Sequence, residues 1–245
     1  TWVGPATGGS WMTPTNWSGN TIPGASDVVE FGVGIAGDIT NVPAVTIAGL
    51  IVADGANITL SKPSAGGANL VTIANTNAGF EFVITEGSRL ALGNEINLRL
   101  ANGTGGNLTR ASIAGEFNVG PQTYNTDGSN VVTSVQTTGV ISVSGSGGVI
   151  SNSASKLQFL GDATYTHNRN GGSIPTANWN SFSTVIVAGV TNSVPGGFGQ
   201  QFGNMIWENA NQSGNQYFGA AGTSINGAFV INSSGSGRLL LSRSL

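Results

Sequence analysis

Two stretches of this chain nearly superimpose, and this repetition restricts the fold more than any other feature. IVADGANITL (51–60) matches VITEGSRLAL (83–92), which begins 32 residues later. A second pair, VISVSGSGGVI (140–150) and VINSSGSGRLL (230–240), shares an identical Ser-Gly-Ser-Gly turn. A repeated unit of strand, turn and strand is typical of a solenoid, in which equivalent side chains of successive turns stack on one another.

Composition points to the same fold class. From Val45 onward, short apolar runs rich in β-branched residues alternate with turn residues, a pattern that predicts strands. Glycine supplies 39 of 245 residues and charged residues only 8%, so the side chains that usually cover helices are scarce. We therefore expect an all-β chain, a right-handed parallel β-helix with turns of roughly 20 to 30 residues. A β-sandwich or jelly roll is the alternative.

The first 35 residues differ from the rest. They hold Trp2, Trp11 and Trp17 among glycine, proline and asparagine. A solenoid leaves the apolar floor of its first turn exposed, and three indole rings would cover it at little cost in chain order. We expect residues 1–35 to form a Trp-rich N-terminal cap or docking segment, and residues 36–245 to form the β-solenoid body of what is a single domain overall.

The C-terminal sequence GRLLLSRSL carries no such covering segment. An apolar final strand is an open edge that natural proteins normally protect. Either the chain continues in the intact protein or a partner docks on this end. Docking predicts self-assembly, in which the last turn of one copy contacts the Trp-rich segment of the next and gives an open filament. The predicted contact residues are Leu239, Leu240, Leu241, Leu245, Trp2, Trp11 and Trp17.

Two features are candidates for a catalytic or metal site. His167, the one histidine, lies in THNRNGGSIP, where Asn-Gly-Gly and Pro175 are typical of a turn between strands. Asp54 and Glu86 fall at equivalent positions of the first repeat, which favours two copies of one turn residue over a carboxylate pair for a cation or for glycoside chemistry. We predict no catalytic residue, metal site or cofactor.

Aromatic residues offer a second function. Trp179, Trp207 and Tyr217 lie in the last third of the chain beside many glutamines and asparagines. Flat rings with neighbouring amides suit a sugar, because the ring covers its apolar face and the amides bond its hydroxyls. The alternative is that these rings pack in the core and the amides form stacked ladders.

Charge and chain chemistry limit the partners. The formal net charge is only −3, and the charged residues are scattered along the sequence without a basic stripe. Nucleic acid is therefore an unsuitable partner. No apolar run approaches a membrane-spanning helix, so we expect a protein that is not embedded in a membrane. The first residue is not methionine, which is consistent with an exported protein whose signal peptide has been removed.

Two segments carry a family resemblance. GGSWMTPTNWSGNTIPGASDVVEF, with its G-x-W, N-W-S and P-G-x-x-D elements, resembles the opening module of secreted Bacteroidetes surface proteins. YTHNRNGGSIPTANWNSFSTVIVAGVTNSVPGGFGQQFGN is similar to a second stretch of the same group. The resemblance implies an extracellular β-solenoid with a structural or adhesive role and no catalytic residues, and it places His167 in a turn typical of the family.

The sequence therefore predicts an extracellular or cell-surface structural protein, a solenoid subunit that assembles head to tail into a fibre, filament or matrix. The partners would be further copies of the chain or other surface proteins. The alternative is a glycan-binding adhesin module of a larger cell-surface protein. An enzyme that acts on polysaccharide is the least favoured hypothesis.

Overall fold

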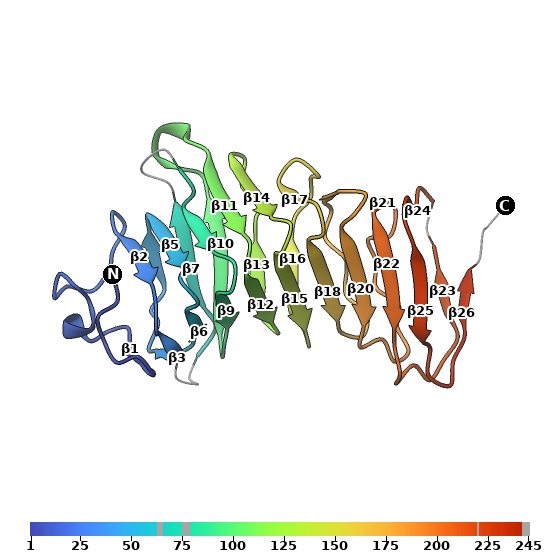
Figure 1. The fold of residues 1–245 in the computed structure, drawn as a ribbon, viewed down its shortest axis with the longest axis horizontal. Coiled ribbons are helices and arrows are strands. Elements are labelled where there is room, and N and C mark those ends of the chain that lie inside the picture. The colour runs from blue at the N-terminus through green and yellow to red at the C-terminus, as the bar shows by residue number, and fades with distance from the viewer. Residues whose placement is uncertain (63–65, 75–78, 220, 242–245) are drawn as a thin grey trace.

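The chain forms an elongated β-solenoid of about nine turns, with its two termini at opposite ends (Figure 1). A computed structural model describes residues 1–62, 66–74, 79–219 and 221–241. Helical structure in these residues amounts to two short 3-10 segments, η1 (Pro14–Asn16) and η2 (Thr104–Gly106). The fold class predicted from the repeats is thus confirmed.

The strands stack into three long sheets that run along the solenoid axis. Sheet 1 has ten strands in the order β1 (Gly8–Ser10), β3 (Ala36–Thr40), β6 (Asn57–Leu60), β9 (Arg89–Leu92), β12 (Glu116–Gly120), β15 (Val140–Ser144), β18 (Thr164–Asn168), β20 (Thr184–Ala188), β22 (Asn204–Glu208) and β25 (Phe229–Ser233). Sheet 2 consists of β2 (Val28–Phe31), β5 (Gly49–Val52), β8 (Phe82–Ile84), β11 (Thr109–Ile113), β14 (Val131–Val135), β17 (Leu157–Phe159) and β19 (Asn178–Trp179).

Sheet 3 is shorter and consists of β4 (Val45–Ile47), β7 (Asn69–Ala74), β10 (Ile96–Ala101), β13 (Thr123–Asn125) and β16 (Gly148–Ile150). Two small parallel ladders complete the last turns, namely β21 (Gln201–Phe202) with β24 (Ser224–Ile225), and β23 (Gln216–Phe218) with β26 (Leu239–Leu241). The named strands of the described residues pair only in parallel, which excludes the sandwich and jelly-roll alternative because those folds are built from antiparallel strands.

The sequence repeats predict the register of stacking correctly. Val52 pairs with Ile84 between β5 and β8, at the offset that the sequence alignment gives. Ile58 pairs with Leu90 between β6 and β9 at the same offset. Gly55 and Gly87 occupy the intervening turns with φ of 79° and 75°, a conformation in which a side chain would be strained. The repeat therefore reflects both stacked core positions and a shared turn.

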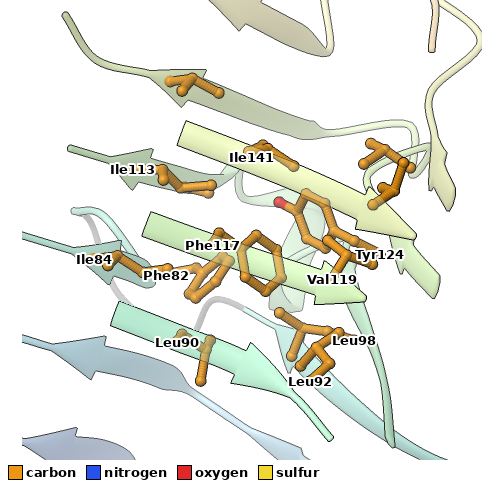
Figure 2. Packing of buried hydrophobic residues seen from close by; sticks show 14 of the residues in the cluster. Phe82, Ile84, Leu90, Leu92, Leu98, Ile113, Phe117, Val119, Tyr124 and Ile141 are labelled. Atoms are coloured by element: carbon orange, nitrogen blue, oxygen red, sulfur yellow. The ribbon is translucent and has the colours of Figure 1, made fainter. Parts of the chain in front are cut away.

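The core is a column of inward-facing side chains from successive turns (Figure 2). Phe82, Phe117 and Tyr124 are fully buried and meet edge to face, with ring centroids of Phe82 and Phe117 5.2 Å apart. Because side chains alternate along a strand, each turn contributes one set to this column and exposes the other. A turn inside the body has a neighbouring turn on each side, whereas each end turn has a neighbouring turn on one side only.

Candidate assembly surface

The last turn presents core-type side chains to the outside. Strands β24, β25 and β26 stack on the preceding turn so that Ile231 lies over Trp207 and Leu241 lies over Phe218. The residues below are buried, Trp207 completely and Phe218 with 7% of its surface exposed. Ile231 is nevertheless 49% exposed and Leu241 64% exposed. Both side chains share the inward orientation of the residues below them, and no other turn of the described residues covers them.

Three more apolar residues share this orientation. Ile225 pairs with buried Phe202, Phe229 with buried Met205, and Leu239 with buried Gln216. All three are only partly buried. We call the set the C-terminal end face, and it comprises Ile225, Phe229, Ile231, Leu239 and Leu241.

The backbone of this end is open as well. Among the described strands, β25 pairs with β22 alone, β24 with β21 and β26 with β23. Each of the three therefore has one edge whose N–H and C=O groups meet no other described strand. Such an edge can accept another parallel strand through main-chain hydrogen bonds.

The structure places the leucines of the predicted contact at different positions. Leu239 and Leu241 belong to the end face, as a period of two requires. Leu240 pairs with the outward-facing Tyr217 and points away from the axis, so it does not belong to the face. Leu245 lies outside the described residues.

Sequence reasoning missed Ile225, Phe229 and Ile231. The second repeat carries the signal for one of them, because its offset of 90 residues aligns Ile231 with the fully buried Ile141 of β15. The turns that follow the two strands also match, with Gly145 and Gly235 both at φ 57°. Ile231 is thus equivalent to a core position, but no turn of the described residues covers it.

The N-terminal end has the opposite character. Trp2, Trp11 and Trp17 are at most 4% exposed, and the rings of Trp2 and Trp17 pack on Phe31 of β2. The centroids of Trp11 and Trp17 are 4.9 Å apart, and those of Trp2 and Trp17 are 5.1 Å apart, both edge to face. The Trp17 indole N–H donates to the Trp11 carbonyl at 2.8 Å. The three rings therefore form the predicted cap, and because they are buried in it they offer no exposed ring face to another copy.

Some backbone groups at the strand edges of this end form hydrogen bonds within the chain. The outer carbonyl of β1 at Ser10 accepts hydrogen bonds from the Asn16 side-chain amide at 2.9 Å and from the Thr13 N–H at 3.3 Å. The Trp2 N–H donates to the Glu30 carbonyl of β2 at 2.9 Å. Val3 and Met12 remain exposed, by 57% and 47%, in the segment that forms this end.

The predicted sugar-binding rings lie mostly in the core. Trp207 is fully buried and Trp179 is 6% exposed, so neither ring face is open to a sugar. Their indole N–H groups donate to Gln212 Oε1 and Gln200 Oε1, both at 2.9 Å. The glutamines that suggested a sugar site therefore satisfy buried indoles, and the core-packing alternative holds for both rings. Tyr217 is 63% exposed and stands apart from them on the outer side of β23.

His167 is a structural residue of β18. Its ring is fully buried, and its Nε2–H donates to the Gly171 carbonyl at 2.8 Å, which leaves Nδ1 to accept from the Tyr165 hydroxyl at 3.4 Å. Burial lowers the pKa of His167, the nearby Arg169 charge lowers it further, and the bond to Gly171 opposes both. The histidine begins the predicted turn by holding the carbonyl of Gly171, where φ is 65°.

The carboxylates weighed as a cation site are turn residues. Asp54 and Glu86 are exposed at equivalent positions of stacked turns. The turns are tied by the Asp54 N–H to Thr85 Oγ1 at 3.2 Å and by the Gly55 N–H to Ser88 Oγ at 3.0 Å. Within the described ranges, no group of three or more His, Asp or Glu side chains is placed to hold a metal ion.

No helix in the described part of the chain combines the length and the apolar character needed to cross a membrane. The resemblance to secreted Bacteroidetes surface proteins stays a prediction, since no family model, curated protein or solved structure matches this chain.

Proposed function

We propose that this chain is an extracellular architectural protein that joins copies of itself head to tail through the C-terminal end face. The observation that carries the proposal is the exposure of Ile231 and Leu241 at positions whose equivalents one turn earlier are buried. Burying a fully exposed large apolar side chain is worth about 1.5 to 3 kcal/mol, so covering the exposed parts of these five residues favours association. An open parallel edge adds main-chain hydrogen bonds.

Head-to-tail stacking suits the direction of the strands. Each turn of this solenoid lies parallel to its neighbour, and only a copy in the same orientation continues that pairing across the junction. The contact on the second copy would involve the exposed Val3 and Met12 rather than the buried indoles. Such a contact is heterologous and does not close, so it produces filaments.

The low content of charged residues is consistent with this role. The location outside the cell rests on the sequence resemblance and on the composition. A second function based on Trp179 and Trp207 is not proposed, because both rings are in the core.

Sedimentation velocity and negative-stain electron microscopy over a dilution series test the proposal. The full chain should form rods that lengthen with concentration, and Ile231→Asp should leave monomers because a carboxylate cannot be buried unpaired at the junction. Val230→Asp is the matched control, since Val230 is 42% exposed on the same strand and points outward. Assembly by Ile231→Asp, or equal disruption by Val230→Asp, would refute the role of the end face.

The orientation has its own test. Met12→Asp should shorten the rods if the N-terminal end receives the C-terminal face. Particles that stop at two copies and are insensitive to Met12→Asp would show instead that two C-terminal faces meet, which would replace the head-to-tail order by a closed dimer.

A further inference from the structure

A polar hollow of about 550 Å³ opens on the outer side of sheet 3, away from both ends of the solenoid. Strands β10 and β13 and the loops that follow them form its walls, and the polar side chains that line it are Arg99, Asn102, Asn125, Asp127 and Ser129. Arg99 and Asn125 are register partners on adjacent strands, so their outward side chains are neighbours. The hollow belongs to no feature of the assembly surface.

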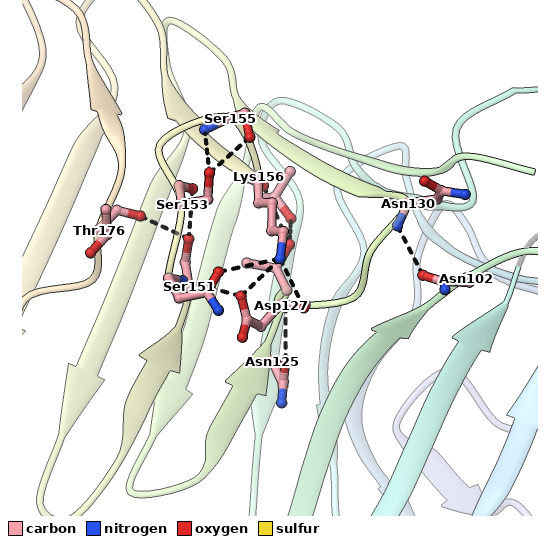
Figure 3. A network of polar contacts seen from close by, with 12 residues as sticks. Asn102, Asn125, Asp127, Asn130, Ser151, Ser153, Ser155, Lys156 and Thr176 are labelled. Carbon is pink, nitrogen blue, oxygen red and sulfur yellow. Dashed lines mark hydrogen bonds and ion pairs between the residues drawn. The ribbon is translucent and has the colours of Figure 1, made fainter.

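Two amide groups of the hollow have a fixed orientation. Asn102 Oδ1 accepts from the Asn130 N–H at 2.9 Å, and Asn125 Oδ1 accepts from the Asp127 N–H at 2.9 Å (Figure 3). Because each oxygen is engaged by the backbone, the NH₂ group of each amide is left as a donor. Neither Nδ2 atom has a hydrogen-bond partner in the described part of the chain.

The hollow carries a net positive charge, because its carboxylate is paired with a lysine while its arginine has no ion-pair partner among the described residues. The Asp127 carboxylate is paired with Lys156 Nζ at 3.1 Å, and it also accepts from the Asn152 N–H at 3.2 Å (Figure 3). Lys156 is held further by the Asp127 carbonyl at 3.0 Å. Arg99 is exposed and forms no ion pair with a described residue, and its one hydrogen bond to a described residue is to Thr72 Oγ1 at 3.4 Å. The guanidinium therefore keeps donors free for a ligand.

We propose that this hollow binds a glycan that carries carboxylates, through its uronic acid residues. Arginine presents paired N–H donors that match a carboxylate, and two oriented amide donors beside it match the ring and hydroxyl oxygens of a sugar. The lining offers more donors than free acceptors, which suits an anionic ligand rich in oxygen and disfavours a cation. The site is independent of the proposed assembly and stands if assembly fails.

Titration calorimetry of the full chain with oligogalacturonate tests the site, with a neutral oligogalactose of equal length alongside. Binding of the acidic sugar should weaken at least tenfold in Arg99→Gln. It should weaken by a similar factor in Asn102→Asp, which keeps the acceptor for the Asn130 N–H and places a negative charge where a donor stood.

Matched variants separate the site from general attraction. Arg110→Gln removes an exposed strand arginine of sheet 2, and Asn118→Asp changes an outward asparagine of sheet 1, so both should bind within about twofold of the parent chain. The proposal is overturned if the acidic sugar does not bind, if Arg110→Gln weakens binding as much as Arg99→Gln, or if the neutral sugar binds equally well. Equal binding of a polyglutamate peptide would also overturn it, because the hollow would then respond to charge alone.

Discussion

The two ends of this solenoid differ in how far their core-type side chains are covered. At the N-terminal end, three indoles cover the first turn, and each is at most 4% exposed. At the C-terminal end, Ile231 and Leu241 occupy core positions in the stacking register but remain about half to two thirds exposed. The difference teaches that a solenoid strand pattern guarantees stacking on the turn before it and guarantees nothing about a turn after it.

The largest expected contrast between the ends is in stability. Trp17→Ala should lower the free energy of unfolding by about 3 to 5 kcal/mol, since it removes ring contacts with Trp2, Trp11 and Phe31. Leu241→Ala should cost less than about 1 kcal/mol, because most of that side chain is exposed. Urea unfolding below the assembly concentration measures both. Similar losses would break the comparison, because they would mean that the C-terminal face is covered in solution.

Within the cap, the indole N–H of Trp17 is hydrogen-bonded to a described residue and that of Trp11 is not, so the two tryptophans should contribute differently to stability. Trp17→Phe removes the donor to the Trp11 carbonyl and should cost about 1 to 3 kcal/mol, partly by leaving a buried acceptor unpaired. Trp11→Phe should cost less, because the Trp11 indole N–H is buried without a hydrogen-bond partner among the described residues and its loss offsets part of the lost ring area. Thermal melts of the two variants give the order. A larger loss for Trp11→Phe would show that ring area alone holds the cap.

Lowering the pH should affect the stability of the body and not that of the two ends, because the one histidine lies in the body. The folded-state pKa of His167 is lowered, so below the ordinary pKa of about 6.5 the unfolded chain binds a proton that the folded chain does not. Stability is therefore complete above that pH and falls as the pH is lowered, by at most about 1.4 kcal/mol per pH unit. Unfolding free energies between pH 7 and pH 5, with His167→Gln as the reference, should show this slope in the parent chain only.

The same acid series bears on assembly. No residue of the C-terminal end face is titratable, so rod formation should change little between pH 7 and pH 5 while the body loses stability. Rods that dissolve in step with the His167 transition would contradict this separation of body and end.

Much of the fold was predictable from the sequence, and the reason is local periodicity. The paired positions of the first repeat, Val52 with Ile84 and Ile58 with Leu90, are the pairs that stack in the structure. Inward residues must match in size and polarity from turn to turn, so the register leaves a trace in the sequence. The cap was predictable too, since a turn-rich segment with three tryptophans has few other uses in a solenoid.

The candidate sites were less predictable, because amide and aromatic residues serve burial and binding alike. Trp207 and Gln212 suggested a sugar site, but the glutamine accepts the buried indole N–H. Alternation along β22, with Met205 and Trp207 both inward, was the signal that could have placed the ring in the core. The hollow on sheet 3 left no comparable signal, since Arg99 and Asn125 are 26 residues apart in the sequence.

By itself, the sequence determined the fold class, the stacking register of the repeats and the presence of an N-terminal cap. These properties depend on side-chain period, turn residues and composition, which a linear chain displays directly. Only the tertiary structure decided which apolar residues are covered and which donors converge, since both depend on contacts between turns. For that reason Ile231 reads in sequence as a core residue, and its exposure becomes visible only when the last turn is in place.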